Sequence, residues 1–237
     1  MKKAIVLGGT TGIGAGVTQY LLADNYKVIV TGIEKEIIES VNSNDNSNYT
    51  AEYLDCINES PSELIKKLFK EYNGIDLVIF SAGIGNLNKD IGYTVENVAN
   101  KLNVLAFTEI IDATIRLFEA QGYGHFVGVS SFSGLFGSRV APAYHAAKAY
   151  QVSYMEGYRQ RARKSKLPIY ITDIRPGFVK TPMTEGKKMI WSATVEVATK
   201  KMYSHIKRKR MVGYITGRWI IAAGIIKLMP RKIRTYF

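Results

Sequence analysis

Two side chains that can move a proton stand one helical turn apart near the middle of the chain. Tyr144 and Lys148 are four residues apart in a helical pattern, so both lie on one face of the predicted helix. A free phenol has a pKa of about 10, and a nearby ammonium favours the phenolate and lowers that pKa. The pair predicts acid/base chemistry in which Lys148 tunes Tyr144.

A hydroxyl stands upstream of this pair, at the predicted end of a strand. Ser131 follows the apolar residues 125–129. The carboxyl ends of strands line the ligand crevice of open α/β sheets. Ser131 is therefore expected beside Tyr144, at the place where a substrate would bind.

A glycine-rich turn follows the first apolar run of the chain. Residues 8–14 read Gly-Gly-Thr-Thr-Gly-Ile-Gly, and a helical pattern begins within them. Glycines allow a tight turn and a close approach to a phosphate, and the start of a helix offers free N–H groups. The turn predicts a site for a nucleotide pyrophosphate.

This combination of glycine turn, Ser131 and the Tyr144/Lys148 pair resembles the short-chain dehydrogenases/reductases, and the resemblance extends over nearly the whole chain. It implies that Tyr144 donates or accepts the proton and that Ser131 orients the substrate oxygen. It also implies that Lys148 binds the nicotinamide ribose, and that Asn103 holds a water which relays protons through Lys148. The cofactor-binding residues that it implies, besides Tyr144 and Lys148, are Gly8, Thr10, Thr11, Gly12, Ile13, Gly14, Asp55, Cys56, Ser81, Ala82, Gly83, Pro176, Gly177, Val179 and Thr181.

Cys56, beside Asp55, is interpreted as a packing residue rather than a nucleophile. Two places depart from the family pattern: Ser81, which stands where an asparagine is usual, and the predicted end of the second strand. NAD enzymes often have an acidic residue at the end of the second strand, which binds the ribose 2′-hydroxyl. Residues 31–33, at the predicted end of this strand, contain no such acid. We therefore expect NADP(H) in preference to NAD(H), with Glu34 as counter-evidence.

Strand and helix patterns alternate along the chain, which is typical of a doubly wound, mostly parallel sheet of about seven strands with helices on both faces. We expect one Rossmann-like α/β domain over residues 1–237, with 218–237 as a basic, apolar extension. The predicted strands are 3–7, 27–31, 49–54, 77–80, 125–129, 169–174 and 211–215. The predicted helices are 14–23, 35–41, 61–72, 95–121, 143–164 and 194–207.

Composition limits the setting of the protein. The single cysteine permits no intramolecular disulfide, and no apolar run is long enough for a membrane span or a signal peptide, so a cytoplasmic protein is expected. The net charge of +12 is uneven: residues 155–237 carry 20 Lys/Arg and 4 Asp/Glu. This asymmetry indicates either an anionic partner or a solvated basic face.

The region 218–232 is an apolar run between basic residues, with Trp219 at its start. Such a segment suits a membrane interface, and equally a helix that completes the substrate pocket or contacts another subunit. The short segment 182–193 contains Met183, Met189, Ile190 and Trp191, which would contact an apolar substrate or pack on the sheet. These features predict an apolar or lipid-like carbonyl or secondary alcohol as substrate.

Other functions stay open at this point. A non-catalytic dinucleotide-binding regulator would not need Ser131, Tyr144 and Lys148 together, whereas a redox epimerase or accessory subunit acting on a lipid-linked sugar would need a partner enzyme. The basic runs lack interleaved aromatics, so nucleic acid is not expected. The three histidines have no ligand-like spacing, so no metal site is expected. The resemblance further implies a homodimer or homotetramer.

Overall fold

Seven parallel strands form one sheet in the computed structural model, which describes residues 1–85, 92–181, 184 and 191–234. The order of the strands is β3-β2-β1-β4-β5-β6-β7, so the chain first winds outward from β1 and then crosses back to β4. The strands are β1 (Lys2–Leu7), β2 (Tyr26–Gly32), β3 (Tyr49–Tyr53), β4 (Leu77–Phe80), β5 (Gly124–Val129), β6 (Ile169–Arg175) and β7 (Val212–Tyr214). The doubly wound parallel sheet predicted from the sequence is confirmed.

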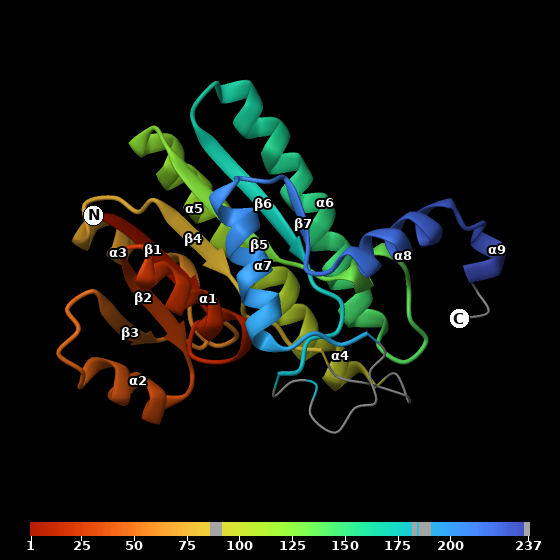
Figure 1. Ribbon diagram of the computed structural model, residues 1–237, viewed down its shortest axis with the longest axis horizontal. Coiled ribbons are helices and arrows are strands. Elements are labelled where there is room, and N and C mark those ends of the chain that lie inside the picture. The colour runs from red at the N-terminus through yellow and green to blue at the C-terminus, as the bar shows by residue number, and fades with distance from the viewer. Residues whose placement is uncertain (86–91, 182–183, 185–190, 235–237) are drawn as a thin grey trace.

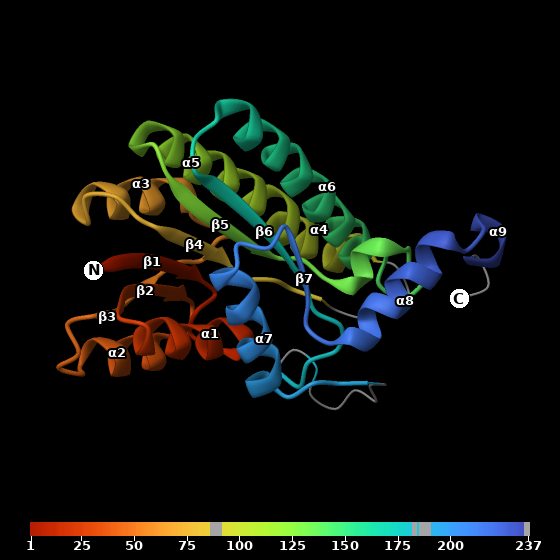
Figure 2. The same ribbon diagram turned by 45° about the horizontal axis from the view of Figure 1, so that its top comes forward.

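Helices cover both faces of this sheet (Figures 1 and 2). One face carries α1 (Gly12–Ala23), α2 (Lys35–Asn42) and α7 (Val195–Lys207), and the other carries α3 (Pro61–Glu71), α4 (Tyr93–Asn100), α5 (Phe107–Gln121) and α6 (Pro142–Ser165). The central strands β1, β4 and β5 are apolar along most of their length because both of their faces are buried. The apolar core therefore lies in two layers with the sheet between them.

The helix predicted over 95–121 is wider in its middle than a regular α-helix. Between α4 and α5 lies a π-helical segment, η1 (Lys101–Ala106), which contains Asn103. The Asn103 side chain there exchanges two hydrogen bonds with the backbone of Ile84, at 3.2 Å and 2.7 Å. Such π segments often lie at functional sites, and this one is held against the loop that follows β4.

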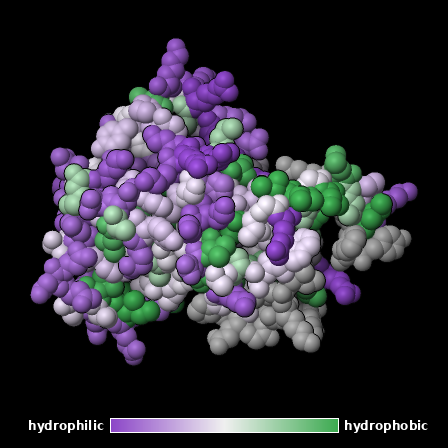
Figure 3. All heavy atoms as spheres, viewed as in Figure 1, coloured by the Kyte–Doolittle hydropathy of each residue, from purple (hydrophilic) through white to green (hydrophobic). Residues whose placement is uncertain are grey.

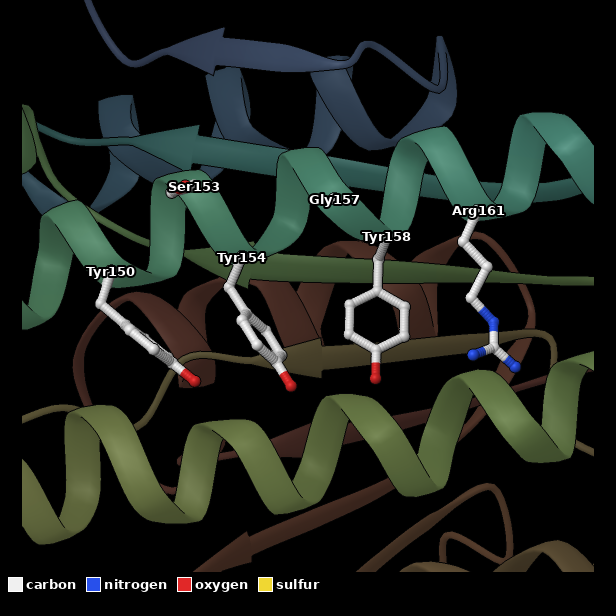
Figure 4. Close-up of a pocket in the computed structure, with 6 residues that line it drawn as sticks. All are labelled: Tyr150, Ser153, Tyr154, Gly157, Tyr158 and Arg161. Carbon is white, nitrogen blue, oxygen red and sulfur yellow. The ribbon is translucent and has the colours of Figure 1, made fainter.

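Tyrosines at helical spacing join α6 to α5 (Figure 4). Tyr150, Tyr154 and Tyr158 point from α6 toward α5, and the Tyr150 and Tyr154 rings stack at 5.0 Å. The Tyr158 hydroxyl donates a hydrogen bond of 3.0 Å to Asp112. Because α6 also carries Tyr144 and Lys148, this packing helps to fix the position of both.

The C-terminal part leaves the sheet after β7. Helices α8 (Gly217–Leu228) and α9 (Arg231–Arg234) extend away from the body of the molecule (Figures 1 and 2). Trp219 and Ala223 of α8 pack with Phe132, which lies in the short 3-10 helix η2 (Phe132–Leu135). Within the described residues, no helix is long and apolar enough to cross a membrane.

Candidate active site

A cleft of about 920 Å³ opens at the carboxyl ends of the strands. It is lined by nearly all of the residues singled out in the sequence: Gly8, Thr10, Thr11, Gly12, Ile13, Asp55, Cys56, Ser81, Ala82, Gly83, Ser131, Tyr144, Lys148, Pro176, Gly177, Val179 and Thr181. Gly14 and Asn103 lie behind the lining and contact residues that form it. Met183, Met189 and Ile190 lie outside the described residues.

The glycine turn forms a cradle at the start of α1. Gly8 and Gly12 have φ values of +73° and +57°, a backbone conformation that favours glycine. A Cβ on Gly14 would lie 2.0 Å from the Gly8 carbonyl oxygen, so only glycine lets α1 begin this close to β1. The first turn of α1 contains no acidic residue. The cradle therefore fits a pyrophosphate, which would accept hydrogen bonds from the free N–H groups of the helix.

Ser131 and Tyr144 meet on the other side of the cleft. Ser131 follows β5 and caps η2, where its hydroxyl oxygen accepts a hydrogen bond of 3.0 Å from Ser133 N. Tyr144 lies with Ser131 in the lining of the same cleft. Burial raises the pKa of the Tyr144 phenol, and the interaction with the Ser131 hydroxyl opposes the rise. In the absence of cofactor, Tyr144 is therefore a protonated phenol at neutral pH, ready to donate its proton.

Lys148 lies one turn beyond Tyr144 and is buried. Its Nζ is 5.8 Å from the centroid of the Tyr144 ring and donates hydrogen bonds of 3.0 Å to Val129 O and to Gln151 Oε1. Burial lowers the pKa of Lys148 from 10.5 to about 7, and the negative charge of Asp173 opposes this shift. A group with this pKa changes its charge near neutral pH, where it would alter the acidity of Tyr144.

Gln151 is a site residue that the sequence analysis missed. It is fully buried, accepts the hydrogen bond from Lys148, and donates one of 2.8 Å from Nε2 to the Asn103 carbonyl oxygen. Asn103, which we expected to act through a water, is thus connected to Lys148 through a side-chain amide. The available signal was a polar residue three positions after Lys148, on the same face of the helix.

A carboxylate stands at the end of β2 although the strand itself has no acid. Glu34 lines the cleft, and its Oε2 accepts hydrogen bonds from Thr10 Oγ1 at 2.6 Å and from the Ile33 backbone N–H at 3.2 Å. A Cβ on Gly32 would lie 2.1 Å from Thr10 Oγ1 and 2.8 Å from Glu34 Oε2. Glu34 therefore folds back over Gly32, into the position where the sequence analysis looked for an acid.

The side chains at the neighbouring strand end have structural partners of their own. Asp55 accepts hydrogen bonds from Ile57 N at 2.9 Å and Asn58 Nδ2 at 2.7 Å, and these bonds lower the pKa of its carboxyl group. Burial raises the pKa of the Cys56 thiol to about 12. Cys56 is therefore a thiol at neutral pH, in agreement with its interpretation as a packing residue.

Aromatic side chains form the part of the cleft nearest α8. Phe136, Phe178 and Trp219 line it. The ring of Trp219 packs edge-on against those of Phe178 and Trp191, with centroid separations of 5.8 Å and 5.9 Å. The sequence analysis placed Trp219 at the start of an apolar segment, and its position here agrees with one of the alternatives given there, a helix that completes the substrate pocket. This end of the cleft suits an apolar ligand. Among the described residues, no group of acids, histidines or cysteines could hold a metal ion.

Comparisons of the sequence and of the fold with known proteins both find short-chain dehydrogenases. A family model described as short chain dehydrogenase matches residues 2–189. An uncharacterized oxidoreductase of Staphylococcus haemolyticus is 28% identical over 188 residues, which cover 78% of this chain and 80% of the relative. A short chain dehydrogenase/reductase of Burkholderia phymatum in complex with NAD has a TM-score of 0.84 at 14% identity, covering 94% of this chain and 92% of its own. A short chain dehydrogenase of Burkholderia cenocepacia in complex with NADP also reaches 0.84, at 17% identity, covering 100% and 98%.

Proposed function

The chain belongs to the short-chain dehydrogenase/reductase family of NAD(P)-dependent oxidoreductases, and on that basis we propose that it interconverts a carbonyl and a secondary alcohol on an apolar, lipid-like substrate. The observation that carries this proposal is the joining of Ser131, Tyr144 and Lys148 within one cleft that also contains the glycine cradle. A non-catalytic regulator would not need this acid/base set. No contact in the described residues favours the epimerase or accessory-subunit alternative.

When bound, a nicotinamide dinucleotide would supply the hydride that reduces the substrate carbonyl carbon, and would itself be oxidised. The chain would supply the matching proton. Ser131 would orient the carbonyl oxygen, and Tyr144 would donate its proton to that oxygen as the alcohol forms. Lys148 would hold the nicotinamide ribose, and its ammonium would stabilise the phenolate left on Tyr144.

The aromatic end of the cleft supports the proposed substrate class. Phe136, Phe178 and Trp219 offer no charged group to a substrate, and Trp219 is held in place by the ring of Phe132 at 4.5 Å. Apolar surface with few polar groups favours an apolar substrate whose oxygen alone is held by hydrogen bonds. We also propose a homodimer or homotetramer, which the resemblance to the family implies.

The choice between the two dinucleotides depends on Glu34. The sequence predicted NADP(H) because β2 ends without an acid, and relatives of this fold bind either dinucleotide. A carboxylate held at this position by Thr10 would accept a hydrogen bond from a ribose 2′-hydroxyl and repel a 2′-phosphate. We therefore propose NAD(H), which revises the preference predicted from the sequence.

Two measurements test the proposal. Titration with NADH and NADPH, followed by nicotinamide fluorescence, should show binding of a dinucleotide, with NADH the tighter. Tyr144→Phe should bind NADH as the wild type does and lose turnover of apolar ketones by a factor of about 10² or more. Tyr93→Phe, which removes an exposed phenol, is the matched control and should leave both quantities unchanged. Full turnover by Tyr144→Phe, or no binding of either dinucleotide, would contradict the proposal.

A further inference from the structure

Helix α8 exposes a face that is apolar along its whole length. The side chains of Ile220, Ile221, Ile225 and Leu228 are 55%, 69%, 57% and 87% exposed. In Figure 3 hydrophobic side chains gather on this helix, on the side where α8 and α9 extend from the body. A helix face exposed to water normally carries polar residues. The outer face of α8 is therefore built for contact with something other than water.

The arrangement around the helix axis is regular. At 3.6 residues per turn, the four exposed side chains fall within an arc of about 140°. Trp219 and Ala223, which are 7% and 4% exposed, lie outside this arc and attach the helix to the protein. One face of α8 is thus already used in the fold, and the opposite face is apolar and largely exposed among the described residues.

The charges that α8 and α9 carry have one sign. Residues 217–234, which span these two helices, contain five Lys/Arg and no Asp/Glu. Arg218, at the start of α8, is exposed. A short apolar helix flanked by cations fits the boundary between the headgroups and acyl chains of an anionic bilayer, where the apolar face enters the lipid and the cations meet phosphate and carboxylate.

A second copy of the chain fits this surface less well. In a two-fold contact the same patch faces itself, so the cations of one copy would face those of the other. Like charges placed opposite one another across an interface oppose association. Anionic lipid supplies the missing negative charge as well as apolar contact.

We propose that α8 docks on the surface of an anionic lipid bilayer through Ile220, Ile221, Ile225 and Leu228. Trp219 lies on the same helix and lines the cleft. Docking would therefore place the aromatic end of the cleft next to the lipid, so that an apolar carbonyl compound dissolved in the bilayer enters without crossing water. This substrate route rests on the proposed function, whereas the docking itself does not.

Cosedimentation of the full chain with vesicles tests the docking. The wild type should sediment with vesicles of equimolar phosphatidylcholine and phosphatidylserine at low salt, and much less with phosphatidylcholine alone. The double variant Ile221→Gln/Leu228→Gln removes apolar side chains without changing the charge, and should weaken the partition coefficient by about ten- to a hundredfold. The control is Val197→Gln/Met211→Gln, because these apolar residues are 45% and 70% exposed outside α8. It should bind as the wild type does.

Three results would overturn the docking proposal. They are no cosedimentation with the anionic vesicles, cosedimentation that the α8 double variant leaves unchanged, and self-association of the wild type that this variant abolishes. Since sedimentation needs no turnover, Tyr144→Phe should bind vesicles normally, which separates failure of docking from failure of the proposed function.

The substrate route makes its own prediction: vesicles should increase turnover of a long-chain ketone by the wild type and not by the α8 double variant. Equal stimulation of both would refute the route.

Discussion

Replacement of Lys148 by methionine should make the folded protein more stable at neutral pH while it impairs catalysis. The Lys148 ammonium is buried beside Val129 O and Gln151, and burial lowers its pKa from 10.5 to about 7. Charging this group inside the protein therefore costs free energy that the unfolded chain does not pay. Methionine has a similar length and no charge, so it removes this cost.

The size and sign of the effect follow from the two pKa values. Each pKa unit is worth about 1.4 kcal/mol, so a shift from 10.5 to about 7 corresponds to a contribution of about 5 kcal/mol to the free energy of unfolding. Below pH about 7 both states carry the proton, and the wild type bears the full cost. Between pH about 7 and 10.5 only the unfolded chain binds the proton, so the wild type gains stability as the pH rises. Above 10.5 the contribution of the charge disappears.

Urea unfolding, followed by far-UV circular dichroism from about pH 6 to about pH 10, measures this effect. The free energy of unfolding of Lys148→Met minus that of the wild type should be largest at the acid end and fall steadily above pH about 7. Taking the difference between the two free energies of unfolding cancels the contributions of the other titrating groups, which both proteins share. Lys164→Met, which removes an exposed ammonium from the same helix, controls for the loss of one positive charge. A difference that stays constant with pH would refute the assignment of a desolvated ammonium at Lys148.

Three further predictions concern the cofactor and the proton. Glu34→Gln should reduce the preference for NADH over NADPH by about ten- to a hundredfold, because it removes the negative charge that would face a 2′-phosphate. The same ratio of the NADH and NADPH dissociation constants in the variant and in the wild type would contradict this. Gln151→Leu should lower kcat by about tenfold and move the pH profile of kcat to lower pH, because the Lys148 ammonium loses an acceptor; an unmoved profile would leave Gln151 with a packing role only. Because burial raises the pKa of Tyr144, carbonyl reduction should proceed at neutral pH, whereas alcohol oxidation should accelerate as the pH rises toward that pKa; equal pH profiles in stopped-flow assays of the two directions would count against Tyr144 as the acid.

Much of the fold and of the catalytic set could be predicted because the signals are local. The strands are short apolar runs, and residues 8–14 lie between the first of them and a helix. Tyr144 and Lys148 share one helix face by their spacing alone, so their proximity needs no knowledge of the rest of the chain. Ser131 was singled out by its position after a predicted strand, the resemblance then implied its role, and the structure places it in the same cleft as Tyr144.

Contacts between distant segments could not be read in this way. Gln151 meets the Asn103 carbonyl across 48 positions of the chain, and Glu34 reaches Thr10 across 24. Nothing in the spacing of either residue predicts such a partner. The revised cofactor preference and the amide link to Lys148 both come from these contacts.

The sequence by itself determined the doubly wound fold, the phosphate cradle and the acid/base pair, since each depends on residues that are neighbours within one element or one turn. Only the tertiary structure decided the charge of Lys148 near neutral pH, because a pKa depends on how much water the surrounding elements exclude. It also decided which face of α8 attaches to the body and which faces outward. The apolar run was visible in the sequence, but its exposure depends on what the rest of the chain leaves uncovered.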